Sequence, residues 1–160
     1  MIKRRQKGFS LIELLIVVAI ILIIAAIAIP NLLRARMQAN ESSAVASIHA
    51  INTAEITYQA AFSTVGYSAL LSNLGDGGVT PCPASATASC YIDSNLASGT
   101  KSGYIFTYTA DTSTPSQTYV LQVDPVTRGI TGQRSFFSSE GNITRNNPTA
   151  PASSSDSPLQ

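Results

Sequence analysis

Residues 8–30, GFSLIELLIVVAIILIIAAIAIP, decide the fold of this chain. The 21 residues from Phe9 to Ile29 contain a single charged side chain, Glu13, and neither glycine nor proline. A helix of that length spans roughly 31 Å, enough to cross the hydrocarbon core of a bilayer, which is about 30 Å thick. The segment therefore predicts a membrane-spanning helix that carries one acidic side chain near its beginning.

Charge is divided sharply along the 160 residues. Four basic side chains lie within the first eight residues, Lys3, Arg4, Arg5 and Lys7. By the positive-inside rule this end should stay in the cytoplasm, and the rest of the chain should face outward. Residues 9–160 hold six basic and nine acidic side chains, a net charge of −3, so the charge does not indicate a nucleic-acid surface.

Three interpretations of the apolar segment compete. The first is an ordinary single-span anchor. The second is an ordinary signal peptide, because Ala26-Ile27-Ala28 is similar to a small-x-small cleavage site. The third explains Gly8 and Glu13 together, since a simple anchor has no use for that glycine or that carboxylate.

The leader MIKRRQKG, the segment FSLIELLIVVAI and the segment AAIAIP together resemble the N-terminus of type IV pilins and of their relatives, the type II secretion pseudopilins. Gly8, Phe9, Ser10, Glu13 and Pro30 match the family pattern in order and spacing, and the match covers residues 3–33. The resemblance implies that a prepilin peptidase at the inner face of the membrane cuts after Gly8. Phe9 would then become the new N-terminus and be N-methylated.

The resemblance also implies a structural subunit rather than an enzyme. Its partners would be identical subunits in a helical filament, the prepilin peptidase and an inner-membrane assembly platform. The precursor would lie in the inner membrane, and the mature chain in a cell-surface pilus or a periplasmic pseudopilus. In a filament the buried charge of Glu13 needs a partner, and the amine of Phe9 in an adjacent subunit is the positive group at that level.

Residues 31–62 contain neither glycine nor proline, and the segment ends at Phe62. Apolar residues recur there at helical spacing on one face: Ala44, Ile48, Ile51, Tyr58 and Phe62. We therefore expect one long helix from about Phe9 to about Phe62. Pro30 removes a backbone hydrogen bond and crowds the preceding turn, which predicts a kink.

Alternating apolar residues then predict strands at 103–110 and 117–124. Tyr104, Phe106 and Tyr108 should share one face of the first strand, and Tyr119, Leu121 and Val123 one face of the second. A third strand is expected over 129–137 and a weak fourth over 141–145. An antiparallel sheet resting on the amphipathic helix gives an α+β, pilin-like fold.

These patterns divide the chain into a leader (1–8), a membrane or filament-core helix (9–30), an amphipathic helix half (31–62), a globular head (63–146) and a tail (147–160). The tail, NPTAPASSSDSPLQ, is rich in proline and serine, which predicts disorder. Cys82 and Cys90 lie in a loop outside the cytoplasm, where a disulfide is the natural state.

Catalytic and cofactor motifs are not recognised in the sequence, so no enzyme, cofactor or metal site is expected. Asp93, Asp111 and Asp124 lie in predicted loops, and we note them only as carboxylates that could converge in space around a cation. A type IV pilin is the leading interpretation and a type II secretion pseudopilin the second. A monomeric membrane-anchored binding protein, or a soluble protein released at Ala28, remain alternatives of other classes.

Overall fold

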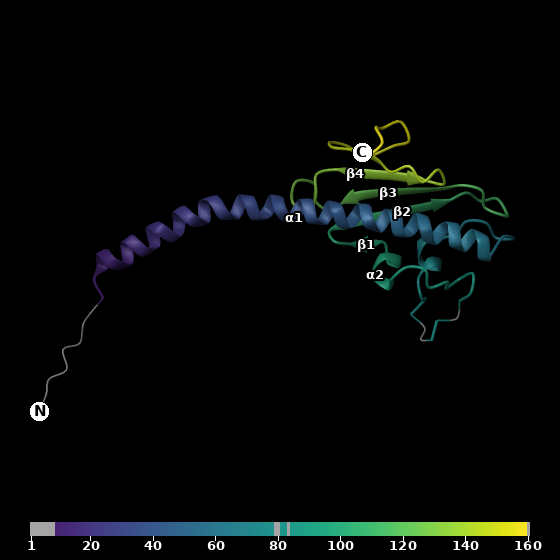
Figure 1. Ribbon diagram of the computed structural model, residues 1–160, viewed down its shortest axis with the longest axis horizontal. Coiled ribbons are helices and arrows are strands. Elements are labelled where there is room, and N and C mark those ends of the chain that lie inside the picture. The colour runs from purple at the N-terminus through teal and green to yellow at the C-terminus, as the bar shows by residue number, and fades with distance from the viewer. Residues whose placement is uncertain (1–8, 79–80, 83, 160) are drawn as a thin grey trace, which may run out of the picture. The chain divides into compact units, whose positions relative to one another are not determined.

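The computed structural model describes residues 9–78, 81–82 and 84–159, and the leader 1–8 lies outside them. The chain divides into two compact units, Met1–Ala35 and Arg36–Gln160, and we call the second the head unit. Figure 1 shows the elements in chain order: α1 (Leu11–Ala61), η1 (Leu71–Leu74), α2 (Ser94–Ala97), β1 (Thr100–Lys101), β2 (Tyr104–Ala110), β3 (Tyr119–Pro125), β4 (Ser135–Ser139) and β5 (Arg145–Asn147).

Helix α1 confirms the expected long N-terminal helix. Apart from Glu13, residues 11–29 are all leucine, isoleucine, valine or alanine, and no glycine interrupts the 51 residues of the helix. Pro30 lies inside the helix, which is continuous through that turn despite the missing backbone donor. A kink at Pro30 remains a prediction.

The end of α1 is fixed by a tight backbone turn. The Phe62 N–H donates to the Tyr58 carbonyl at 2.8 Å, and the Val65 and Gly66 N–H groups both donate to the Phe62 carbonyl. Gly66 has a φ of +83°, in the left-handed region that favours glycine. The chain turns away from the helix at this glycine and continues toward η1.

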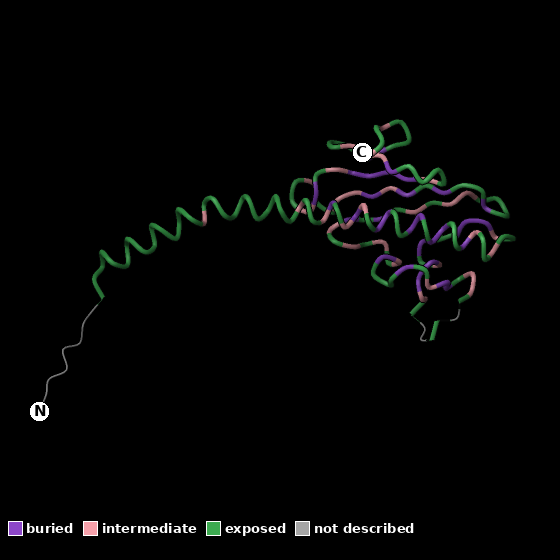
Figure 2. Tube along the Cα trace, viewed as in Figure 1, coloured by how far each residue is buried: buried purple, intermediate pink, exposed green. Residues whose placement is uncertain are grey.

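The amphipathic face of α1 packs against the sheet, and Figure 2 shows the buried residues concentrated there within the head unit. Ala44, Ile48, Ile51 and Tyr58 are each at most 1% exposed, and Phe62 is partly buried against the same core. The helical spacing in the sequence therefore identified the core face correctly.

The five strands form one antiparallel sheet in the order β1-β2-β3-β4-β5, so each strand pairs with its neighbour in the chain. The predicted period-two alternation of β2 and β3 is confirmed by the side chains that are at most 4% exposed: Tyr104, Phe106, Tyr119, Leu121 and Val123. Tyr108 shares their face and is half-buried. The architecture is the expected α+β fold.

The last two strands lie further along the chain than the sequence predicts. Residues 129–134 form a turn instead of a strand, because the Gly129 N–H donates to the Gly132 carbonyl at 2.8 Å and Gly129 has a φ of +82°. Strand β4 begins only at Ser135, and β5 occupies Arg145–Asn147 instead of 141–145. The region 63–102 also contains η1, α2 and β1, which its composition does not reveal.

The C-terminal segment makes specific contacts with the sheet, in contrast to the expected disorder. The Leu159 N–H donates to the Thr144 carbonyl at 2.8 Å, and the Asn146 N–H donates to the Ser157 carbonyl. Ala152 is 1% exposed, and its carbonyl accepts a hydrogen bond from the Gln122 amide. These bonds extend the sheet edge past β5, so they order a stretch whose composition alone favours disorder.

Candidate functional site

The two predicted assembly residues, Phe9 and Glu13, lie at the beginning of α1. Phe9 is 82% exposed and precedes the helix. Glu13 accepts a hydrogen bond at its Oε2 atom from the Ser10 N–H at 3.0 Å. Ser10 and Glu13 are thus placed as in a capping box, in which a carboxylate three residues into a helix satisfies a backbone donor before it. Gly8, the predicted residue before the cleavage, lies outside the described residues.

The capping contact shows what Glu13 does in a single chain. Its carboxylate lies beside the positive end of the helix dipole and, among the described residues, accepts a hydrogen bond from the Ser10 backbone N–H. No ion pair involves Glu13 among the residues that the structure describes.

Around and beyond Glu13 the helix presents an apolar surface on every side. The large hydrophobic side chains from Leu11 to Ile29 are 45–80% exposed, and among the described residues α1 alone is long and apolar enough to cross a membrane. The all-round pattern is that of a helix covered by lipid or by other apolar helices. A water-exposed helix of this composition would be strongly unfavourable.

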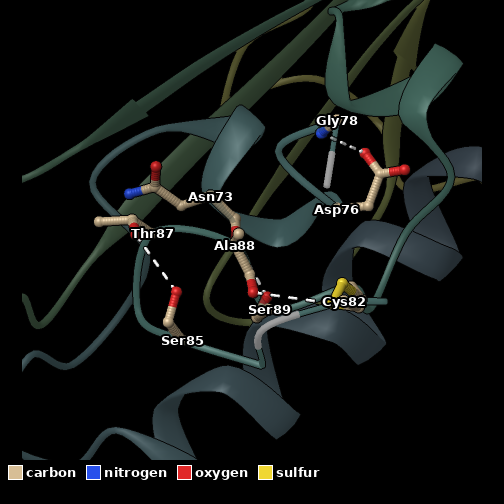
Figure 3. Close-up of a disulfide and its surroundings, with 9 residues drawn as sticks. Asn73, Asp76, Gly78, Cys82, Ser85, Thr87, Ala88 and Ser89 are labelled. Carbon is tan, nitrogen blue, oxygen red and sulfur yellow. Dashed lines mark hydrogen bonds between the residues drawn. A yellow bond between two sulfur atoms is a disulfide. The ribbon is translucent and has the colours of Figure 1, made fainter. Parts of the chain in front are cut away.

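Cys82 and Cys90 form the expected disulfide in the head unit, with their Cα atoms 6.4 Å apart (Figure 3). The loop that they close is also fastened by hydrogen bonds. The Ser89 N–H and hydroxyl both donate to the Asn73 carbonyl, and the Tyr58 hydroxyl donates to the Ala86 carbonyl at 2.6 Å. The disulfide therefore supports a loop that already contacts α1 and η1.

We predict that both cysteines resist alkylation in the exported protein until a reductant is added. Replacing both by serine should lower the free energy of unfolding by roughly 2.5 kcal/mol, because so small a closed loop restricts the unfolded chain. Mass spectrometry after alkylation tests the bond, and denaturant unfolding of the double variant tests its contribution. Two alkylated cysteines in unreduced, exported protein would contradict the prediction.

Two buried glutamates on α1 escaped the sequence analysis. Glu41 is 7% exposed and forms an ion pair with Arg134 at 2.8 Å, while it also accepts from the Gln133 and Arg134 N–H groups. Burial raises the pKa of Glu41, but these donors and the guanidinium outweigh it, so the net shift of the pKa is downward. Glu41 thus joins α1 to the turn that precedes β4.

Glu55 is the second, and it is fully buried. Its two carboxylate oxygens accept from the N–H and the hydroxyl of Ser68, at 3.0 and 2.5 Å. Burial raises the pKa of Glu55, and the Ser68 donors only partly offset this effect. The spacing of the helix contained a signal for both residues, since positions 41, 44, 48, 51, 55, 58 and 62 continue one pattern of three and four.

The three aspartates expected in loops do not converge on a common site, and Asp124 lies in β3. Asp93 pairs with Lys101 at 2.8 Å, Asp111 accepts bonds within its own turn, and Asp124 accepts from the Ser135 hydroxyl. Among the described residues no group of three histidine, cysteine or acidic side chains is placed to hold a metal ion. The functional features that remain are the N-terminal segment and the contacts that hold the head.

The family motif that matches this chain lies in the N-terminal segment. The prokaryotic N-terminal methylation motif matches residues 3–29. The type IV wide pilus major component PilA4 of Thermus thermophilus is 59% identical over 46 residues, 29% of this chain and 35% of the relative. The type IV major pilin protein PilA of Myxococcus xanthus is 48% identical over 54 residues, 34% of this chain and 24% of the relative.

A secretion protein is similar over a comparable length. The type II secretion system core protein G of Aeromonas hydrophila is 39% identical over 57 residues, 36% of this chain and 40% of the relative. The chain therefore spans between about a quarter and two fifths of the length of these three relatives. No solved structure gives a significant match.

Proposed function

We propose that this chain is a prepilin, a structural subunit that is cleaved after Gly8, N-methylated at Phe9 and polymerised into a type IV pilus. The observation that carries the proposal is the methylation motif over residues 3–29, joined to a helix whose apolar surface is exposed on every side. Such a surface requires a membrane before assembly and other copies of the same helix afterwards. Its partners are the prepilin peptidase, the inner-membrane assembly platform and identical subunits.

In this proposal the two units of the chain have different roles. Residues 9–30 anchor the precursor in the inner membrane and later form the filament interior. The head unit remains outside the cytoplasm and, in the mature filament, faces the surroundings. The contacts of Glu41, Glu55 and the disulfide maintain the head and have no role in chemistry, in keeping with relatives that are structural subunits.

Mass spectrometry of the N-terminus tests the processing directly. We expect sheared surface filaments to contain a chain that starts at a methylated Phe9. The variant Gly8→Glu should remain at precursor mass, because a peptidase that cuts after glycine accepts only a very small residue there. A mature chain that starts at Ile29 would eliminate the proposal in favour of a signal peptide, and normal processing of Gly8→Glu would contradict the cleavage assignment.

A type II secretion pseudopilin is the second candidate, favoured by the similarity to core protein G. Electron microscopy with antibodies against the head unit separates the two. Long surface fibres that carry this chain support the pilin. Methylated chains confined to the periplasm, together with a defect in protein export when the gene is deleted, support the pseudopilin.

A further inference from the structure

The buried carboxylate of Glu55 has no role in the proposed processing or assembly, and its surroundings are unusual. Glu55 and Ser68 are both 0% exposed. None of the lysine, arginine or histidine side chains that the structure describes forms a hydrogen bond or ion pair with Glu55. A charged carboxylate without a cation is unfavourable in such a place, whereas a neutral carboxylic acid is not.

Tyrosines face Glu55 from the elements packed around it. Tyr58 lies one turn further along α1, Tyr67 precedes Ser68, Tyr108 comes from β2 and Tyr119 from β3. Burial raises the pKa of all four phenols, and a negative charge on Glu55 raises it further. Glu140 acts in the same sense on Tyr67 and Tyr119. The titratable groups that surround Glu55 in the described part of the chain are therefore neutral or negative.

The hydrogen bonds fit a neutral acid well. The Ser68 N–H donates to Oε2 of Glu55, and the Tyr108 hydroxyl donates to the Ser68 carbonyl at 2.9 Å. If Oε1 of Glu55 carries a proton, it can donate to the Ser68 hydroxyl, which is then free to donate to the Tyr108 hydroxyl 3.3 Å away. If Glu55 is ionised, the Ser68 hydroxyl must donate to Oε1, and this last bond is lost. The neutral form makes one more hydrogen bond than the ionised form.

Ser68 belongs to a segment that joins α1 to the far end of the β2–β3 hairpin. The Ser116 N–H donates to the Val65 carbonyl at 2.8 Å, and the Tyr67 N–H donates to the Ser116 carbonyl at 3.2 Å. The contact of Glu55 with Ser68 therefore holds α1, the 65–68 segment and the 111–117 loop together.

We propose that Glu55 is a protonation-controlled lock, which fastens the 65–68 segment and the hairpin end to α1 when it is neutral and loosens them when it ionises. With this lock, the head unit is most stable at mildly acidic pH. It is independent of whether the chain forms a pilus.

The sign of the pH effect follows from the raised pKa of Glu55. Its ordinary value is 4.5, and burial places the folded value above this. Between the two values the folded chain binds more protons than the unfolded chain, so stability falls as the pH rises through this window. The lowered pKa of Glu41 acts in the opposite direction below 4.5, where stability is lost as the pH falls. The Glu55 contribution to stability is therefore lost as the pH rises above 4.5, and the Glu41 contribution is lost as the pH falls below 4.5.

The test is denaturant unfolding of the full chain in detergent micelles between pH 4.5 and 8, followed by the near-ultraviolet signal of its buried tyrosines. We expect the unfolding constant of the wild type to rise by up to tenfold per pH unit above 4.5 until the folded pKa is passed. Glu55→Gln should remove this rise, and Glu41→Gln, the matched buried glutamate, should retain it. A flat wild-type profile, or a rise that persists in Glu55→Gln, overturns the lock.

A second measurement does not depend on how well the variant folds. Carbon-13 NMR of the Glu55 carboxyl in the wild-type chain should give a titration midpoint above 4.5. The Ser68 amide should exchange with solvent faster, beyond the intrinsic effect of base, as that midpoint is passed. A midpoint at or below 4.5 overturns the proposal even if Glu55→Gln does not fold.

Discussion

Cells that produce Glu13→Ala in place of the wild-type chain should make few or no filaments, although the variant is inserted and cleaved normally. Alanine makes the helix more apolar, so membrane insertion should improve. A carboxylate near the centre of a membrane helix costs about 2.5–3.5 kcal/mol, although Glu13 lies only four residues from Phe9, close to the membrane surface. The expected defect is therefore confined to contacts between subunits.

The physical reason is an exchange of partners. In the single chain Glu13 accepts one hydrogen bond from the Ser10 N–H. In the proposed filament, apolar helices would surround this level and would bury the new amine of Phe9 as well, so Glu13 of a neighbouring subunit would be its partner. Removing one member of a buried pair leaves the other uncompensated, at roughly 3–5 kcal/mol. This corresponds to a subunit contact at least ~100-fold weaker, repeated along the filament.

Glu13→Gln is the control that separates pairing from capping. Glutamine keeps an oxygen that can accept from the Ser10 N–H, but it carries no charge. If Glu13 acts only as a helix cap, worth about 1 kcal/mol, Glu13→Gln should assemble like the wild type. If it pairs with the amine, Glu13→Gln should fail as Glu13→Ala does. The measurement is the ratio of sheared to membrane-bound chain, with the mature mass verified; wild-type ratios for Glu13→Ala rule out the pairing.

The sequence predicted those parts of the fold that local periodicity governs. Spacings of three and four placed Ala44, Ile48, Ile51 and Tyr58 in the core, and alternation did the same for β2 and β3. The same reasoning missed Glu55, because it considered only apolar residues. Ile51 and Tyr58 are seven positions apart, and the position between them that faces the core carries a glutamate. A helix position, rather than a residue type, decides which side chains are buried.

What the sequence could not predict depends on contacts between distant residues. The C-terminal segment is ordered by backbone bonds to Thr144 and Asn146 and by the Gln122 amide, and its composition records none of these. The ion pair of Glu41 with Arg134 joins residues 93 positions apart. The N-terminal segment is the opposite case: its motif is readable in the sequence, whereas its proposed function requires neighbouring subunits that a single chain does not contain.

Gly66→Ala should unfold or severely destabilise the head unit. Gly66 has a φ of +83°, and a Cβ added there would meet the backbone of Ser116, with the carbonyl carbon only 2.9 Å away. Ser116 cannot retreat without breaking its bonds to Val65 and Tyr67. We expect a loss of about 4 kcal/mol or more, from left-handed strain, the clash and the lost hydrogen bonds combined. Near-ultraviolet circular dichroism should show melting roughly 8–16 °C lower.

Gly78→Ala isolates the steric part of this effect. Gly78 has a similar φ of +74°, but no atom of the described residues lies within 4 Å of an added Cβ. Its variant should therefore bear the left-handed strain alone, about 1 kcal/mol, and a less flexible unfolded chain offsets part of that. Since a domain is commonly stable by only 5–15 kcal/mol, Gly66→Ala should also reduce the amount of exported chain, and Gly78→Ala should not. Equal melting temperatures for the two variants would mean that the 65–68 segment does not approach Ser116 closely. In that case the contact of Glu55 with Ser68 would not connect α1 to the end of the β2–β3 hairpin.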